Sequence, residues 1–107
     1  MDVYKRLKEL GLTLPPPPAR GGLYTPCKCF GNNLYYVSGC GPAMGDHTYI
    51  GKLGREISLE EGQKAARDCM LNVLSVLQAS IGDLNRVKNA LPGNIPVETE
   101  AIFEVES

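Results

Sequence analysis

Several residue types that would indicate particular chemistries are scarce in this chain. It contains no tryptophan, two phenylalanines and a single histidine, His47, in 107 residues. Eleven lysines and arginines nearly balance twelve aspartates and glutamates, for a formal net charge of −1, and the basic residues are scattered. A protein that follows a phosphate backbone needs a concentrated basic patch. The sequence therefore argues against nucleic acid as a main partner.

A long hydrophobic run is also missing. Residues 1–8 are charged and carry no apolar stretch, so we expect neither a secretory signal nor a membrane span there. Hydrophobic residues make up 43% of the chain, which at this length predicts one small domain. Such a domain buries only about two-thirds of its unfolded surface. We expect a cytoplasmic protein without a membrane partner, whose stability depends on oligomerisation.

The four cysteines are too few and too unevenly spaced for a disulfide scaffold, so we expect reduced thiols. Zinc is the sharper alternative, because Cys27, Cys29, Cys40 and His47 could supply four ligands. The spacing weakens that alternative, since Cys27 and Cys29 are only two residues apart. Cys69 lies in a helical pattern, where a free cysteine commonly packs as a small hydrophobe. We predict no metal and no cofactor.

Residues 1–21 form a predicted lead-in to the main domain, which spans residues 22–107. Asp2 can cap a short helix that Gly11 ends. Four consecutive prolines at 15–18 fix φ and lack amide donors, which enforces an extended polyproline II segment. A ligand for a proline-recognition domain is an alternative. The flanking residues show no specificity pattern, so we favour a rigid linker.

The first part of the main domain predicts a hairpin followed by a long helix. The hairpin is predicted over residues 23–42, where residues 31–33, Gly-Asn-Asn, tolerate positive φ and separate two segments rich in Tyr, Val and Leu. Ser58 and Glu61 form a capping box at the start of the helix, and Gly82 ends it. Helical spacing places an apolar stripe on this helix, with the members Leu59, Ala65, Ala66, Cys69, Met70, Val73, Leu74, Leu77 and Ile81.

Two further strands are predicted after the helix. Residues 83–88 start the first, which ends before the turn signal at 91–94. The second runs from Val97 to Val105 and alternates between apolar residues on one face and glutamates on the other. The order of elements predicts an α+β fold, in which a long helix covers one face of a mixed or antiparallel sheet.

Three segments, in this order, resemble the reactive intermediate deaminase (RidA/YjgF-like) family, whose members deaminate enamines and imines. They are residues 35–42, the helix at 60–82 with its Gly-Asp-Leu exit, and residues 97–105. The lead-in resembles that of long-form members. The resemblance implies a chorismate-mutase-like, RidA-type fold, a homotrimer, and a metal-independent hydrolase site for a small metabolite in a cleft between subunits.

The same resemblance implies roles for five residues. Glu98 matches the catalytic glutamate that positions the attacking water, and Tyr24 matches the tyrosine that closes the pocket. Ser38 and Gly39 match the pair whose backbone contacts the substrate, and Cys40 lines the pocket beside them. Without the resemblance, each has a structural alternative. Glu98 would be an edge-protecting charge, Tyr24 a packing residue, Ser38-Gly39 a bulge or strand end, and Cys40 an unreactive thiol.

One departure from the family pattern concerns its carboxylate-binding arginine, which has no counterpart here. At residues 89–91, a helix and a strand of the family, about 40 residues at ordinary element lengths, are missing. Either the protein is shortened, or the sequence joins two stretches across a disordered region. In the first case we expect weak or absent deamination of 2-aminoacrylate-type substrates. The substrate carboxylate would lack the bidentate guanidinium of the family's arginine, which a lysine does not replace. In the second case, deaminase activity is the leading interpretation.

Three hypotheses about function stay open. The protein is an enamine/imine deaminase, a non-catalytic binder of a small metabolite or partner protein, or an endoribonuclease, an activity ascribed to some relatives. The acidic balance and the absence of a basic patch argue against the third.

Overall fold

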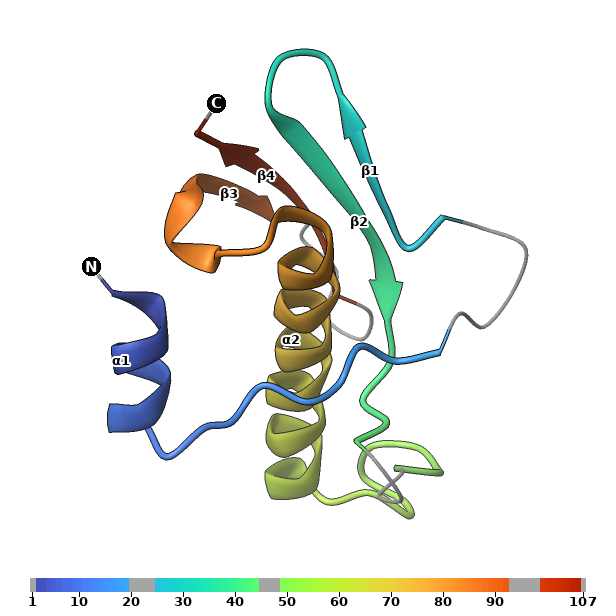
Figure 1. The fold of residues 1–107 in the computed structure, drawn as a ribbon. Coiled ribbons are helices and arrows are strands. Elements are labelled where there is room, and N and C mark those ends of the chain that lie inside the picture. Colours follow the sequence, from blue (N-terminus) through green and yellow to red (C-terminus); the bar gives the residue numbers. More distant parts are fainter. Residues whose placement is uncertain (1, 20–24, 45–48, 93–98, 107) are drawn as a thin grey trace.

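A computed structural model describes residues 2–19, 25–44, 49–92 and 99–106 (Figure 1). A long helix lies across one face of a sheet, and a short N-terminal helix stands beside it. The helices are α1 (Val3–Glu9) and α2 (Leu59–Ile81). The strands are β1 (Cys27–Phe30), β2 (Leu34–Cys40), β3 (Val87–Pro92) and β4 (Thr99–Val105).

The four strands form one sheet in the order β1-β2-β4-β3, and every neighbouring pair is antiparallel. This confirms the predicted α+β class and decides between a mixed and an antiparallel sheet. The predicted hairpin is also confirmed, since Gly31 and Asn33 adopt positive φ values of 55° and 63° in the turn between β1 and β2. Both residue types tolerate that conformation. The first strand begins at Cys27, later than residue 23, where the hairpin was predicted to start.

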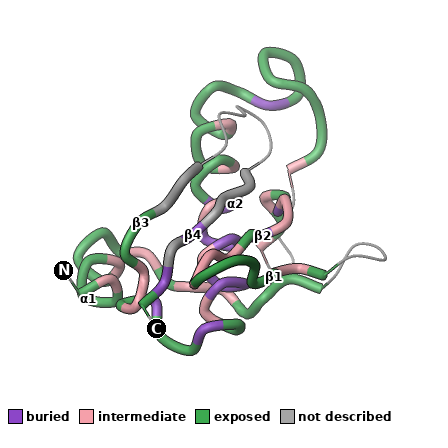
Figure 2. The backbone as a smooth tube through the Cα atoms, turned by 90° about the horizontal axis from the view of Figure 1, so that it is seen from above, coloured by how far each residue is buried: buried purple, intermediate pink, exposed green. Residues whose placement is uncertain are grey.

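Helix α2 begins and ends where the sequence predicts. The backbone N–H of Glu61 donates to Ser58 Oγ at 3.2 Å, and the backbone N–H of Ser58 donates to Glu61 Oε1 at 3.2 Å, which completes the capping box. Gly82 follows the last turn with φ 87°. Along its length, α2 packs on β2 and β4 and buries Val73 and Leu77 completely. The core therefore lies between this helix and the centre of the sheet (Figure 2).

The predicted apolar stripe of α2 is wrong at two positions and too narrow elsewhere. Leu59 is 74% exposed and Ala66 is exposed as well. Two apolar and three polar residues outside the stripe are buried instead, namely Asp68, Leu71, Asn72, Ser75 and Val76. The cause is a second covering layer, because the lead-in and the loop after β2 lie along the side of α2 that does not face the sheet.

The lead-in packs against the rest of the chain. Asp2 caps α1, as predicted, and Tyr4 Oη accepts a hydrogen bond of 2.9 Å from the backbone N–H of Leu84. Farther along, Ser75 Oγ on α2 donates to the carbonyl oxygen of Pro15. The proline run therefore lies across the helix as a strap (Figure 1).

The segment after α2 differs from its prediction. Residues Leu84–Arg86 form a 3₁₀ turn, and β3 begins only at Val87. Asp83 caps this turn by accepting from the backbone N–H of Asn85, which favours a turn over an extended start. Leu91 and Pro92, predicted to lie in a turn, belong to β3. Among the described residues, no helix has the length and apolar character needed to cross a membrane.

Candidate small-molecule site

A cavity of about 230 Å³ lies where the end of β2 meets α2 and the proline-rich lead-in. Its walls are small or apolar residues, together with one buried amide side chain. The lining residues are Pro18, Ala19, Pro26, Ser38, Gly39, Cys40, Gly41, Ala43, Asn72 and Val76. Such a concave, mostly apolar space with few polar groups is typical of a small-ligand site.

The wall formed by β2 is a bulge in the sheet. Val37 pairs with Ala101 and Cys40 with Thr99, so Ser38 and Gly39 together oppose the single residue between those partners. An extra residue bends a strand and redirects its groups. On the other side, the backbone N–H of Ser38 donates to the carbonyl oxygen of Pro26 at 2.9 Å. The bulge expected as a structural alternative and the predicted pocket wall are therefore the same feature.

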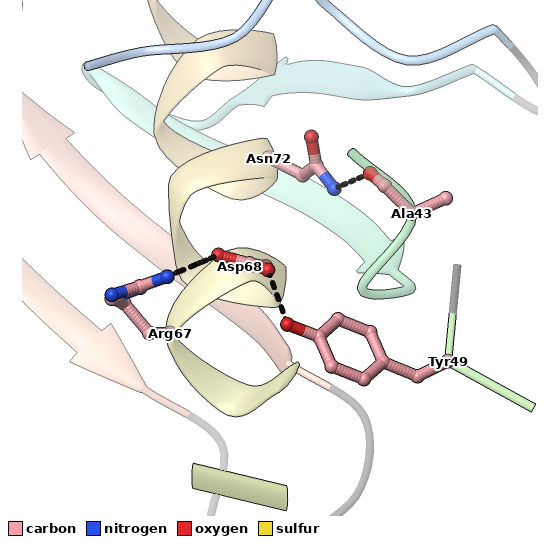
Figure 3. A network of polar contacts seen from close by, with 5 residues as sticks. All are labelled: Ala43, Tyr49, Arg67, Asp68 and Asn72. Carbon is pink, nitrogen blue, oxygen red and sulfur yellow. Dashed lines mark hydrogen bonds and ion pairs between the residues drawn. The ribbon is translucent and has the colours of Figure 1, made fainter. Parts of the chain in front are cut away.

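Asn72 forms the polar wall of the cavity on α2. Its Nδ2 group donates a hydrogen bond of 3.0 Å to the carbonyl oxygen of Gly41. A second, of 2.7 Å, goes to the carbonyl oxygen of Ala43 (Figure 3). The side chain is only 2% exposed. Two neutral hydrogen bonds in a buried place hold the segment after β2 firmly against the helix. Asn72 thus fixes the rim of the cavity.

A second buried polar residue, Asp68, lies one turn earlier on α2 and holds the next part of the loop. Tyr49 Oη donates to Asp68 Oδ2 at 2.9 Å, and Arg67 pairs with Asp68 Oδ1 at 3.3 Å (Figure 3). Burial of the Tyr49 ring and the hydrogen bond to this carboxylate raise the pKa of Tyr49. Neither Tyr49 nor Asp68 lines the cavity. We interpret this cluster as structural support for the loop.

The Cys40 thiol is buried in the cavity wall, and its Sγ lies 3.5 Å from the carbonyl oxygen of Ser38. Burial, with a smaller contribution from Cys69, raises the pKa of the Cys40 thiol. A thiol with a raised pKa stays protonated at neutral pH, whereas the thiolate is the nucleophile. The geometry therefore suits a passive wall residue.

A testable consequence concerns the order in which the cysteines react. At pH 8 iodoacetamide should alkylate the exposed Cys29 first. Cys40 should react at least roughly tenfold more slowly, because its thiol is buried and protonated. Raising the pH toward 10 should increase the relative rate at Cys40. Peptide mass spectrometry of timed samples measures both rates. Preferential modification of Cys40 at pH 8 would contradict the assignment of a passive thiol.

The structure gathers three of the five predicted site residues around one cavity. Ser38, Gly39 and Cys40 all line it, while Tyr24 and Glu98 lie outside the described residues. Their roles therefore stay predictions. Asn72 was missed, although the sequence carried a signal, because a polar residue beside the apolar stripe of a core helix needs a partner if it is buried.

No charged side chain lines the cavity among the described residues. Arg67 pairs with Asp68. Arg86 donates to the carbonyl oxygens of Ile81 and Glu106, and Arg55 pairs with its neighbour Glu56. Arg20 lies outside the described residues. The described walls therefore offer a carboxylate no cationic partner.

In the part of the chain that the structure describes, no three His, Cys, Asp or Glu side chains gather in a way that could hold a metal ion. His47, the fourth ligand of the zinc alternative, lies outside that part.

Comparison with known proteins extends this description. No family model matches the chain. It is 38% identical over 106 residues to Protein TCP17 of Trypanosoma cruzi, which covers 98% of this chain and 66% of that protein. A "putative endoribonuclease" from Shewanella oneidensis MR-1 superposes with a TM-score of 0.78 at 32% identity, over 84% of this chain and 60% of the other. Protein Atu1372, with unknown function, from Agrobacterium tumefaciens superposes with a TM-score of 0.75 at 27% identity, over 95% and 92% of the two chains.

These comparisons show a shared fold. The chain spans just under two-thirds (66%) of the length of TCP17 and 60% of that of the Shewanella protein, but nearly all of the Agrobacterium protein. The fold of this chain is therefore shared with the two solved structures over the residues that superpose.

Proposed function

We propose that this protein is a RidA-type deaminase that hydrolyses small enamines or imines in the cavity at the bulged end of β2. The observation that carries the proposal is this cavity, whose wall contains Ser38, Gly39 and Cys40, the positions that match the family's pocket. The fold shared with the Shewanella and Agrobacterium proteins supports it. The short, mostly apolar walls suit a small ligand.

The chemistry requires few groups. Water adds to the carbon of the C=NH bond, the resulting carbinolamine loses ammonia, and a carbonyl remains, so that R₂C=NH and H₂O give R₂C=O and NH₃. A positioned proton acceptor for the water is the main requirement. We assign that role to Glu98 and the closing of the pocket to Tyr24, while the backbone of Ser38 and Gly39 contacts the substrate. No metal or cofactor is needed.

We further propose that the protein works in the cytoplasm as a homotrimer. Support comes from the sheet face opposite α2. Phe30 and Tyr36 lie on that face by strand alternation, since Val37 faces the helix, and they are 41% and 38% exposed. Exposed aromatic residues on a sheet face favour association. Light scattering on the protein as it elutes from a size-exclusion column measures the number of subunits, which we expect to be three.

The described cavity walls, which carry no charged side chain, predict a preference among substrates. An imine made from isopentylamine by an amine oxidase should be hydrolysed at least roughly tenfold faster than the imine made from leucine by an amino-acid oxidase. Only the second imine carries a carboxylate, for which the described walls offer no cationic partner. Semicarbazide trapping of the remaining imine measures both rates. Faster turnover of the leucine-derived imine would show that a cation reaches the site and would contradict this assignment.

A second candidate is binding without catalysis. The absence of charged side chains from the described cavity walls favours it. Saturable binding of an uncharged small ligand without any acceleration of imine hydrolysis would establish it. RNA cleavage, suggested by the name of the Shewanella protein, has weaker support, since the chain has a net charge of −1. Salt-dependent RNA binding would revive it.

A further inference from the structure

The amide of Asn72 has a fixed orientation. Its nitrogen faces two carbonyl oxygens, those of Gly41 and Ala43, at 3.0 and 2.7 Å. If the amide were turned over, its oxygen would face both carbonyl oxygens and neither contact could be a hydrogen bond. The nitrogen therefore points toward the loop, and Oδ1 must point the other way (Figure 3).

Oδ1 of Asn72 is an acceptor that the described part of the chain leaves without a hydrogen-bond partner. Among the described residues, Gln78 Oε1 is the one side-chain atom that has neither a hydrogen-bond partner nor access to solvent. Asn72 Oδ1, which also has no partner among these residues, therefore keeps some accessible surface. Since Asn72 is 98% buried and lines the cavity, the accessible surface it keeps adjoins the cavity. A buried acceptor normally has a partner, so this one is available to a ligand.

We propose that Oδ1 of Asn72 accepts a hydrogen bond from an N–H group of the ligand. The inference rests on the proposed function for the location of the ligand and goes further by naming the chemical group that is recognised. Enamines and imines carry that donor on the nitrogen that leaves as ammonia. Asn72 is then a substrate-binding residue, and its two bonds to the loop hold the acceptor in place.

The same contact distinguishes substrate from product. After hydrolysis a carbonyl oxygen replaces the C=NH group, and two acceptor oxygens would then face each other. A site that bonds an N–H group rejects an analogue that lacks it, because its buried acceptor loses its partner. Asn72 therefore favours entry of the imine and release of the carbonyl product.

The test uses two uncharged probes of the same shape. Butyramide carries an NH₂ group where 2-pentanone carries a methyl group. Their affinities for the wild type and for Asn72→Ala are measured by NMR titration, following the backbone amides of Gly39 and Gly41. Loss of one neutral hydrogen bond predicts that the substitution lowers the affinity ratio of butyramide to 2-pentanone about fivefold. An Asn72 with only a structural role would weaken both probes equally and leave the ratio unchanged.

Ser75→Ala is the matched control, because Ser75 is buried on the same helix and bonds a carbonyl oxygen of the lead-in, but does not line the cavity. It should leave the ratio unchanged. If Asn72→Ala does not fold, the side-chain ¹³Cγ resonance of wild-type Asn72 decides. This resonance should move downfield when butyramide binds and should not move when 2-pentanone binds. If both probes bind but the resonance moves equally or not at all, the role of Asn72 is contradicted while the proposed site stands. If neither probe binds, the proposed site itself fails.

Discussion

Leu77→Ala is expected to lower the free energy of unfolding by about 2–5 kcal/mol, the usual cost of emptying a fully buried leucine site. Leu77 is 0% exposed and belongs to the core cluster that also contains Val37, Phe103 and Val105. Because a small domain has little stability in reserve, a loss of this size is a large part of the total.

The matched control is Leu59→Ala on the same helix. Leu59 is 74% exposed, so its replacement should change the free energy of unfolding by less than about 0.5 kcal/mol. Urea denaturation followed by circular dichroism measures both variants. Equal destabilisation by the two substitutions would mean that the first turn of α2 is covered, and would contradict the packing described here.

Gly41→Leu is expected to weaken ligand binding strongly while leaving the fold intact. Gly41 lines the cavity, and a Cβ atom placed on it would meet no atom within 4 Å. Its φ lies outside the left-handed region, so a side chain introduces no backbone strain. Its carbonyl oxygen can still accept from Asn72. A leucine side chain there competes with the ligand for space, which should weaken the affinity for butyramide about tenfold or more.

Gly41→Ala is the graded control for this prediction, because it adds a single methyl group to the same open space. It should retain most of the affinity and the wild-type midpoint of unfolding. If Gly41→Leu unfolds the protein, the cavity is smaller than described. If it binds butyramide as well as the wild type does, the ligand lies elsewhere.

Local signals in the sequence were enough for much of the fold. The hairpin follows from Gly31 and Asn33, and α2 from the Ser58–Glu61 capping box with Gly82 as its end. Each of these depends on neighbouring residues alone, so one sequence suffices to predict it. The α+β order of elements follows from them together.

Errors arose where distant segments decide the outcome. Leu59 fits the apolar period of α2, yet nothing in the described structure covers it. Ser75 lies off that period, yet the lead-in at Pro15 covers it and supplies its hydrogen-bond partner. Periodicity shows which residues share a helix face, but not how many faces of the helix are covered. The second layer on α2 could not be predicted from that pattern.

The candidate site was likewise predicted only in part. Resemblance to a family located Ser38, Gly39 and Cys40, which the structure brings to one cavity. Asn72 comes from a segment more than 30 positions away in sequence, and its partners are backbone carbonyls of the loop after β2, which no sequence pattern reveals. Glu98 and Tyr24 lie outside the described residues, so their roles stay predictions.

The most direct measurement is the rate at which the purified wild-type protein, compared with Gly41→Leu, hydrolyses the uncharged imine made from isopentylamine. Acid–base groups positioned around a substrate contribute at least about a hundredfold, so the wild type should accelerate carbonyl formation by roughly that factor and the variant should not. Hydrolysis at the uncatalysed rate with the wild type, or equal acceleration by the two proteins, would contradict a deaminase site in the cavity between β2 and α2.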